Sequence, residues 1–196
     1  MKLDFEKAYD KVNWEFLFSC LETRGFNATW CDWIKSVVSG GTVCIKLNNK
    51  TGPYFVSHKG VRQRDPLPPI LFNFVADCLA RMIRQAQKSW LMVGLASNII
   101  PFGVASLQYA NDTIICLKED LEIARNMKLL FYLYEKMSGL KINFRKSEVI
   151  VINGDFELHN QYSEIFNCQI GTFPLKYLGV PVILGRFRVK DWNPLI

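Results

Sequence analysis

The chain has 196 residues, with 24 Lys and Arg against 18 Asp and Glu, a formal net charge of +6 and a hydrophobic fraction of 49%. At about 150 residues per domain, this length allows one domain, or one domain with an appendage. Charged residues at 21%, aromatic residues at 13%, and only 8 Pro and 12 Gly exclude a disordered or collagen-like chain and indicate a folded, basic, soluble protein.

Hydrophobic periodicity predicts helices and hairpins along the whole chain. The predicted elements in chain order are a strand ending at Phe5, a helix over 8–25, a helix from Asn27 or Thr29 to Gly40, a hairpin with strands at 42–47 and 53–57, a helix from Pro68 to near Trp90, a hairpin over 107–117 with Asn111-Asp112 at its turn, a helix over 123–137 ending at Gly139, and strand-like runs at 148–152 and 176–184. Because hairpins outnumber regular crossovers, this order favours an α+β fold over a doubly wound sheet.

The positive charge is concentrated in one segment. Residues 35–88 hold nine basic residues against two acids, a balance of +7, whereas the rest of the chain balances to −1. Such a segment, interleaved with Tyr54 and Phe55, suits a phosphate backbone. Charge alone leaves open that these are ordinary solubilising side chains on strand edges and helix faces.

The cysteines and the amino end indicate an intracellular chain. No two of the six cysteines are closer than 11 positions, which excludes the short spacings of zinc and thioredoxin-like motifs and favours reduced, mostly buried thiols. The amino end lacks the continuous apolar stretch of a secretory signal, and the most apolar neighbourhood, residues 70–82, is interrupted by polar residues. We therefore expect a protein of the cytoplasm or nucleus that is neither secreted nor membrane-embedded.

Two aspartates near strand ends are the first candidates for chemistry. Asp4 lies at the end of a predicted strand, and Asp112 lies in a predicted hairpin turn between two apolar strands. Acids in such places could supply the hard oxygen ligands of a Mg²⁺ site for phosphoryl or nucleotidyl transfer. Taken alone, either residue fits a helix cap or a turn more readily, and spacing does not decide between these roles.

Five sequence blocks give these aspartates a context. They are KLDFEKAYDKVNWEFL at 2–17, GVRQRDPLPPILFNFVADCL at 60–79, LQYANDTIIC at 107–116, GLKINFRKSEVI at 139–150 and FPLKYLGVPV at 173–182. In this order, and over nearly the whole chain, they resemble the reverse transcriptase of non-LTR, LINE-type retrotransposons, with features of the plant elements. The resemblance implies an RNA-directed DNA polymerase that extends a 3′-hydroxyl with deoxynucleotides and two Mg²⁺ ions, with Mn²⁺ as an alternative.

The resemblance assigns roles in the first two blocks. Asp4 matches the palm aspartate that binds both metal ions, and Tyr9 matches the aromatic residue that excludes the ribose 2′-hydroxyl. Arg62 and Gln63 match the element usually written RQGDPLSP, where a guanidinium and an amide suit the triphosphate and sugar. Arg64 stands at the glycine of that element, where a positive φ would cost on the order of 1 kcal/mol and the side chain would fill space near the nucleotide.

The third block departs from the family at a metal ligand. The family carries Tyr-Ala-Asp-Asp where this chain has Tyr109-Ala110-Asn111-Asp112. Asn111 offers one oxygen without charge and cannot bridge two ions, so Asp4 and Asp112 leave two carboxylates where the family has three. Because metal ions supply most of the charge neutralisation in this reaction, we expect a loss of several orders of magnitude in rate.

The last two blocks carry softer assignments. Lys146 matches a region near the triphosphate, where a lysine could protonate departing pyrophosphate, although a solvated basic turn fits at least as well. Tyr177, Leu178 and Gly179 resemble the palm–thumb hairpin that grips the primer, although the aromatic ring equally suits ordinary packing.

The resemblance therefore predicts an α+β polymerase palm with a small antiparallel sheet packed on helices, and with fingers and thumb largely missing. Residues 1–196 form a reverse transcriptase palm domain in this prediction, with a motif-bearing core at 1–152 and a partial palm–thumb connection at 153–196. The implied partners are an RNA template, a DNA primer and deoxynucleotide triphosphates, with the missing polymerase segments acting in trans as a further partner.

Asn111, Arg64 and the missing fingers and thumb count against present activity. The prediction is therefore a reverse transcriptase domain of retrotransposon origin that is catalytically impaired. Two alternatives are a non-catalytic remnant that binds nucleic acid through the basic segment, and an element-derived fragment without function.

Overall fold

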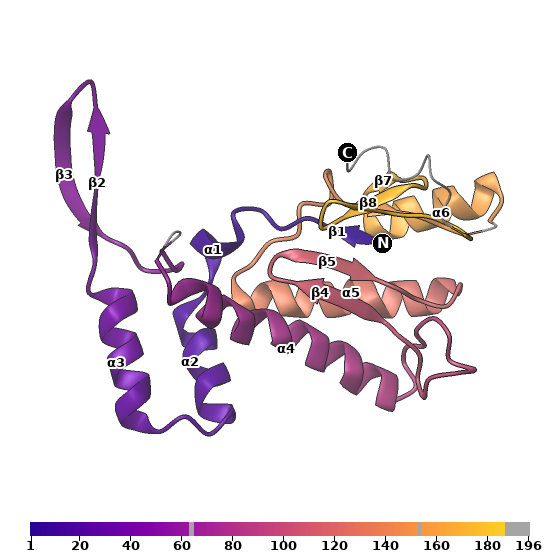
Figure 1. Ribbon diagram of the computed structural model, residues 1–196, viewed down its shortest axis with the longest axis horizontal. Helices are drawn as coiled ribbons and strands as arrows, with labels where there is room; N and C mark the ends of the chain where they lie inside the picture. Colours follow the sequence, from indigo (N-terminus) through magenta and orange to yellow (C-terminus); the bar gives the residue numbers. More distant parts are fainter. Residues whose placement is uncertain (63–64, 153, 187–196) are drawn as a thin grey trace. The chain divides into compact units, whose positions relative to one another are not determined.

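The structure, a computed structural model, describes residues 1–62, 65–152 and 154–186 (Figure 1). Its helices are α1 (Ala8–Lys11), α2 (Trp14–Thr23), α3 (Ala28–Ser39), α4 (Pro68–Lys88), α5 (Leu121–Ser138) and α6 (Phe156–Phe166). Its strands are β1 (Lys2–Leu3), β2 (Thr42–Leu47), β3 (Lys50–Val56), β4 (Ser106–Tyr109), β5 (Asp112–Ile115), β6 (Glu148–Val149), β7 (Gln169–Ile170), β8 (Leu175–Tyr177) and β9 (Val180–Val182). This irregular mixture of helices and small sheets confirms the α+β class.

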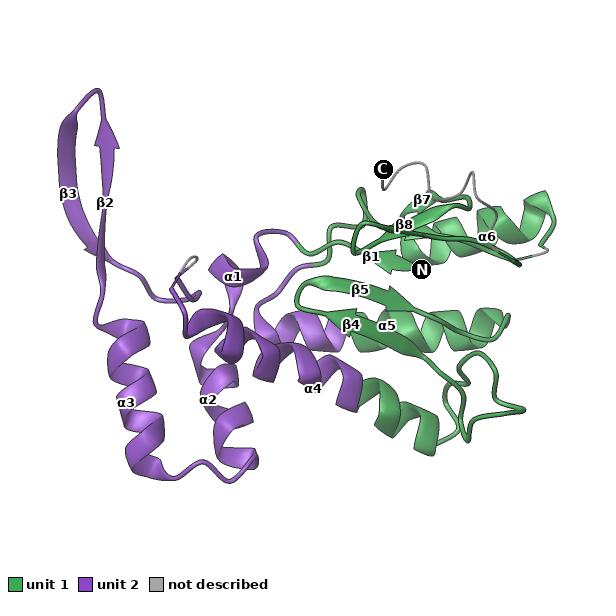
Figure 2. Ribbon diagram, in the orientation of Figure 1, with its two compact units in different colours: residues 1–5, 82–131, 142–196 green, residues 6–81, 132–141 purple. Residues whose placement is uncertain are grey.

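The chain forms two compact units, drawn in green and purple in Figure 2. The first comprises residues 1–5, 82–131 and 142–196, and the second comprises residues 6–81 and 132–141. Each unit is therefore assembled from segments that lie far apart in the sequence, and the long helices α4 and α5 contribute residues to both.

The first unit is built on a five-stranded sheet in the order β4-β5-β1-β6-β7. Neighbouring strands are antiparallel except for β6 and β7, which are parallel. Ile115 of the sheet and Met127 and Phe131 of α5 are buried, and the rings of Phe131 and Phe166 lie 6.2 Å apart. The predicted small sheet is present, with one parallel pair in place of a wholly antiparallel order.

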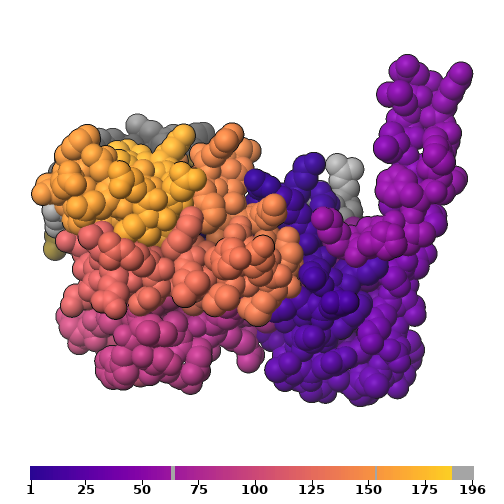
Figure 3. Space-filling view, turned by 180° about the vertical axis from the view of Figure 1, so that it is seen from behind, coloured from indigo at the N-terminus to yellow at the C-terminus, as the bar shows by residue number. Residues whose placement is uncertain are grey.

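The second unit packs α1, α2, α3 and the first part of α4. Leu17, Leu21 and Ile34 are buried in its core. Strands β2 and β3 form a separate two-stranded sheet, and Figure 3 shows this hairpin standing away from the rest of its unit. Its apolar side chains stay in solvent, with Ile45 68% and Leu47 71% exposed.

The helix predicted over 8–25 is two helices, because the backbone leaves the helical conformation at Val12 and Asn13 caps the next helix. The Asn13 side chain accepts a hydrogen bond from the Phe16 backbone N–H (3.2 Å) and so caps α2. Its own backbone N–H donates to the Ser138 carbonyl (2.8 Å) instead of continuing a helix. The apolar residues keep their spacing across this break, which is why periodicity alone predicts a single helix.

The turns of the hairpins differ from the predictions in length or position. Asn48 and Asn49 form a two-residue turn between β2 and β3, both with positive φ, in place of a five-residue loop. Tyr109 pairs with Asp112, so the second turn is Ala110-Asn111 and Asp112 belongs to the strand. The strand-like run predicted at 176–184 is itself a hairpin, formed by β8 and β9.

Helix α6 and strand β7 were not predicted. Asp155 caps α6 by accepting a hydrogen bond from the Leu158 backbone N–H (2.8 Å), and Asn167 ends it in the left-handed conformation. The helix buries Tyr162 and Phe166 among otherwise more exposed residues. Because only these two residues form the apolar stripe, the hydrophobic periodicity of the segment is too weak to predict a helix.

The described ranges contain no helix that is both long enough and apolar enough to cross a bilayer. All six cysteines are free, as predicted, with three of them buried and three half-buried.

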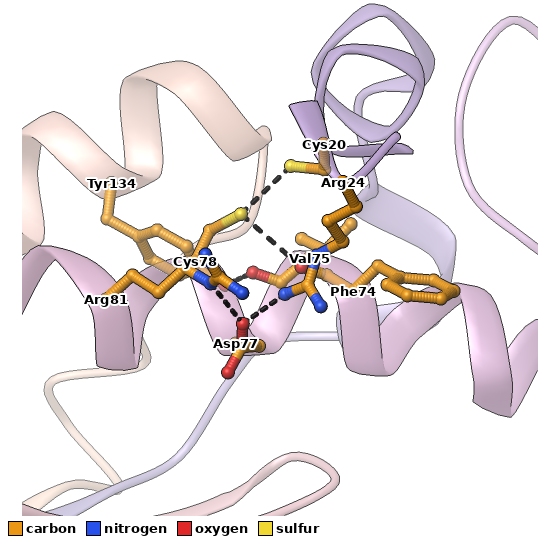
Figure 4. Close-up of polar contacts among 8 residues, drawn as sticks. All are labelled: Cys20, Arg24, Phe74, Val75, Asp77, Cys78, Arg81 and Tyr134. Carbon is orange, nitrogen blue, oxygen red and sulfur yellow. Dashed lines mark hydrogen bonds and ion pairs between the residues drawn. The ribbon is translucent and has the colours of Figure 1, made fainter. Parts of the chain in front are cut away.

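Asp77 of α4 forms ion pairs with two arginines, Arg24 at the C-terminal cap of α2 and Arg81 of α4 (Figure 4). Burial acts to raise the pKa of Asp77, but the hydrogen bonds and positive charges of the two guanidinium groups outweigh it and hold this pKa below its ordinary value. Such a carboxylate stabilises the fold above its unfolded-state pKa, and the contribution is lost as pH falls through the folded-state pKa.

We expect Asp77→Asn to lower the free energy of unfolding by about 0.5 kcal/mol at neutral pH, since the Asp77 side chain is 41% exposed and solvent screens the pairs. The difference from the unmodified chain should disappear when the pH falls well below the ordinary carboxyl value of 3.8. Urea denaturation at neutral pH and at about pH 2 measures both. Asp32→Asn, which removes a more exposed pair with Lys35, is the control. A difference that persists unchanged in acid would contradict the expectation.

Candidate metal and nucleotide site

Two short strands bring the predicted metal-binding aspartates together. β1 pairs antiparallel with β5, with Leu3 opposite Thr113. Continuing this register by one residue places Asp4 opposite Asp112. Both residues are half-buried, and neither carboxylate forms an ion pair within the described part of the chain. Two acids that are far apart in sequence therefore share one place in the sheet.

Asp4 is held by the turn over 143–147. Its backbone N–H donates to the Ser147 hydroxyl (3.1 Å), and its carbonyl accepts from the Asn143 backbone N–H (2.8 Å). Ser147 is buried, and its hydroxyl donates in turn to the Asn143 carbonyl (2.9 Å). The predicted Lys146 is exposed on this same turn. Nothing in the sequence except their place in the fourth block pointed to Asn143 and Ser147.

Asn111 lies on the hairpin turn beside the two aspartates. Asp112 is the first residue of β5, which corrects its predicted place in the turn, while Asn111 is exposed beside it. Ala110 completes the turn with φ 51°, in the left-handed region that residues with a side chain seldom adopt. The pairing of β4 with β5 therefore holds the backbone of Asp112 in place, and Ala110 is the residue of the turn with a strained backbone conformation.

We expect Ala110→Gly to raise the free energy of unfolding by about 0.5–1 kcal/mol, because glycine adopts a positive φ without a Cβ clash. Urea denaturation of the unmodified and variant chains measures this difference. Ala28→Gly, at an exposed position in the first turn of α3, is the matched control and should lower the free energy of unfolding instead. The explanation by strain is wrong if both substitutions destabilise the chain equally.

The β8–β9 hairpin carries the predicted primer-grip residues. Tyr177 pairs with Val180, which leaves Leu178 (φ 51°) and Gly179 (φ 85°) as exposed turn residues. Burial raises the pKa of the Tyr177 hydroxyl, and the negative charge of Asp112 raises it further. This electrostatic effect indicates that the Tyr177 phenol lies near the Asp112 carboxylate.

The predicted nucleotide contacts Tyr9 and Arg62 belong to the second unit. The Tyr9 ring stacks on the buried Phe72 ring of α4, with centroids 4.7 Å apart and planes inclined by 29°. The Tyr9 carbonyl accepts a hydrogen bond from the Val61 backbone N–H (2.7 Å), so the segment that carries Arg62 runs beside α1. The exposed Arg62 guanidinium covers Gly41, where an added Cβ would lie 1.6 Å from Nη2.

The structure thus gathers the predicted site residues in two groups. The first unit brings Asp4, Asn111, Asp112 and Lys146 to strands β1 and β5 and the turns beside them, and the charge of Asp112 acts on Tyr177. The second unit holds Tyr9 and Arg62 on neighbouring segments. Gln63, the remaining predicted nucleotide contact, and Arg64 lie outside the described residues.

Three residues of the first group carry oxygen atoms of the kind that a hard divalent cation binds. The carboxylates of Asp4 and Asp112 and the amide oxygen of Asn111 are ligands of the kind that Mg²⁺ accepts. Residues 1–62, 65–152 and 154–186 hold no cluster of three His, Cys, Asp or Glu side chains suited to a metal. A pair of ions that share bridging carboxylates does not fit this set, because its third member is a neutral amide.

Comparison with known proteins shows several similar chains, among them two Pol polyproteins and a transposon protein. A retrovirus-related Pol polyprotein from the type-2 retrotransposable element R2DM of Drosophila melanogaster is 33% identical over 98% of this chain and 17% of its own length. A Pol polyprotein from a type-1 R2 element of Popillia japonica is 26% identical over 74% of this chain and 23% of its own length. The transposon TX1 uncharacterized 149 kDa protein of Xenopus laevis is 24% identical over 97% of this chain and 14% of its own length.

The chain spans less than a quarter of the length of each of these relatives. The family described as Reverse transcriptase (RNA-dependent DNA polymerase) matches residues 1–182. As the five blocks predicted, the chain belongs to the reverse transcriptase family and is related to the polyproteins of non-LTR retrotransposons.

Proposed function

We propose that residues 1–196 are the palm region of an RNA-directed DNA polymerase whose nucleotidyl transfer is impaired. In this proposal the motif-bearing core is 1–152, and 153–196 is a partial connection to a thumb. The observation that carries the proposal is the register of β1 and β5, which opposes Asp4 to Asp112 while the neutral Asn111 occupies the adjoining turn.

In this proposal the first group of residues holds the metal and the departing group. Asp4, Asp112 and the Asn111 amide would hold a divalent cation, Mg²⁺ or Mn²⁺, which would supply positive charge to the reacting phosphates when bound. Lys146 would give a proton to departing pyrophosphate. Tyr177, Leu178 and Gly179 would contact the primer strand.

The second group selects the nucleotide in this proposal. Tyr9 would refuse the ribose 2′-hydroxyl, and its stack on Phe72 supports a fixed ring orientation. Arg62 and Gln63 would bind the triphosphate and sugar of a deoxynucleotide. An RNA template and a DNA primer are the remaining partners in this proposal. An intracellular location follows from these partners.

The impaired nucleotidyl transfer in this proposal follows from the missing negative charge at position 111. A carboxylate at position 111 would add a full negative charge and a second ligand oxygen, and asparagine supplies neither. Phosphoryl chemistry of this kind depends on positioning and charge neutralisation, so the loss falls on the rate of the chemical step rather than on folding.

Primer extension on an RNA template tests the proposal. The unmodified chain, supplied with deoxynucleotides and either Mg²⁺ or Mn²⁺, should extend the primer no faster than an Asp4→Asn, Asp112→Asn double variant. Faster extension by the unmodified chain would contradict the impairment.

Nucleic-acid binding without catalysis is the second candidate function. The observation in its favour is the β2–β3 hairpin, which presents exposed Lys46 and Lys50 together with Tyr54, 69% exposed, and Phe55, 50% exposed. Cations track a phosphate backbone, and exposed rings stack on bases. A primer–template whose affinity for the chain falls with salt would support this function whether or not extension occurs.

A further inference from the structure

Two cysteines 58 positions apart meet between helices α2 and α4 of the second unit. The Cys20 and Cys78 sulfurs lie 2.9 Å apart, close enough to share a hydrogen bond (Figure 4). Cys20 is 7% exposed, and Cys78 is half-buried. All six cysteines lie in the described residues, and no other pair of their sulfurs is in such contact.

The charges around the pair favour a thiolate. Arg24 caps α2 one turn after Cys20, and Arg81 lies one turn after Cys78 on α4. Asp77 pairs with both arginines. Two positive groups therefore face one negative group. The hydroxyl of Tyr134 is directed elsewhere, since it donates to the Val75 carbonyl (3.1 Å).

The pKa directions agree with this arrangement. The hydrogen bond from Cys20 lowers the pKa of Cys78, and the two guanidinium groups act in the same direction against burial. The same hydrogen bond and burial raise the pKa of Cys20. Cys78 is therefore the sulfur of the pair that loses its proton more readily, although in its thiol form it also donates to the Phe74 carbonyl (3.3 Å).

We propose that Cys20 and Cys78 form an oxidisable dithiol that a peroxide converts into an intramolecular disulfide between α2 and α4. The Cys78 thiolate attacks one peroxide oxygen, the O–O bond breaks, and Cys78 becomes a sulfenic acid as the first water leaves. The Cys20 sulfur then attacks the Cys78 sulfur, the S–O bond breaks, and a second water leaves. The two thiols supply both protons and both electrons, so one peroxide becomes two waters.

The two sulfurs are already close to bonding distance. A disulfide is about 2.05 Å long, so the sulfurs, now 2.9 Å apart, must approach by about 0.9 Å. The bond would tie α2, which follows the Tyr9 segment, to α4, which carries the Phe72 ring beneath Tyr9. Because it closes a long loop, it should raise the melting temperature by roughly 5–10 °C.

Peptide mapping of the full chain tests the proposal. After hydrogen peroxide treatment, blocking of free thiols and trypsin digestion without reductant, the peptides 12–24 and 65–81 should be joined through Cys20 and Cys78. Dithiothreitol should separate them and reverse the rise in melting temperature. The proposal is wrong if peroxide leaves these two peptides unjoined, or joins other cysteines equally fast.

Variants of the charged neighbours test the role of Cys78. Arg24→Gln should slow disulfide formation severalfold, because it removes a positive charge beside Cys78. Asp77→Asn should accelerate disulfide formation, because it removes the negative charge that neutralises the two arginines. Cys31→Ser, at a buried cysteine of α3, is the matched control and should leave the rate unchanged. Circular dichroism verifies that each variant is folded. Equal rates in the Arg24 and Asp77 variants would overturn the assignment of Cys78 as the attacking sulfur.

Discussion

Asn111→Asp is expected to raise RNA-templated primer extension at least about 100-fold over the unmodified chain. The substitution adds a carboxylate on the turn next to Asp112, across the sheet from Asp4. Three carboxylates supply enough charge and enough oxygens to hold two divalent ions, whereas the present set fits one. The side chain is exposed on the turn, so the change should leave the fold intact.

Incorporation of labelled deoxynucleotide in Mg²⁺ measures this gain, with single-turnover rates separating chemistry from binding. Asn98→Asp is the matched control, since it adds the same charge at an exposed position of the same unit. Adding Asp4→Asn to the Asn111→Asp chain should abolish the gain. If Asn98→Asp accelerates extension equally, the effect is one of net charge and the metal-ligand explanation fails.

Arg64→Gly should add to the gain from Asn111→Asp. The family element has glycine at this position, and arginine there adds bulk and, at a positive φ, strain on the order of 1 kcal/mol. The double variant is therefore expected to bind deoxynucleotide more tightly than the single variant, seen as a lower KM at an unchanged kcat. A lower kcat in the double variant would contradict this.

The helices that the sequence predicts correctly are those that end through local chemistry. Gly40 follows the last residue of α3, and Pro68 stands at the first residue of α4, so caps and stops lie within a few residues of the pattern. Asn13 divides α1 from α2 partly through a hydrogen bond to Ser138, a residue far away in sequence. No local pattern contains that partner, and the periodic stripe therefore predicts one helix.

The same limit applies to the candidate site. The blocks identify Asp4 and Asp112 because both keep the residue type of the family's metal ligands, and they identify Asn111 because its place in the motif is that of a ligand. The support of Asp4 by Ser147, 143 positions away, and the meeting of Cys20 with Cys78 depend on how distant segments pack. The spacing of residues along the chain predicts neither contact, because the partners of this serine and of these cysteines are determined by how the chain folds.

Replacing Lys46, Lys50 and Lys59 by glutamine is expected to weaken binding of an RNA–DNA primer–template at least about tenfold at 50 mM salt. These three cations are exposed on the β2–β3 hairpin and just after it. Each phosphate contact releases counterions, so losing one reduces the slope of log affinity against log salt by about 0.9. Fluorescence anisotropy over a salt series gives both the dissociation constant and the slope.

The matched control replaces Lys118, Arg125 and Lys136, three exposed cations outside residues 35–88, and removes the same charge. If both triple variants weaken binding equally, net charge rather than the hairpin governs affinity. If the unmodified chain fails to bind at low salt, binding is removed as a function and an element-derived fragment without function is the remaining alternative for an inactive chain. A hairpin-specific loss, by contrast, would tie the excess charge of residues 35–88 to a phosphate backbone rather than to solubility.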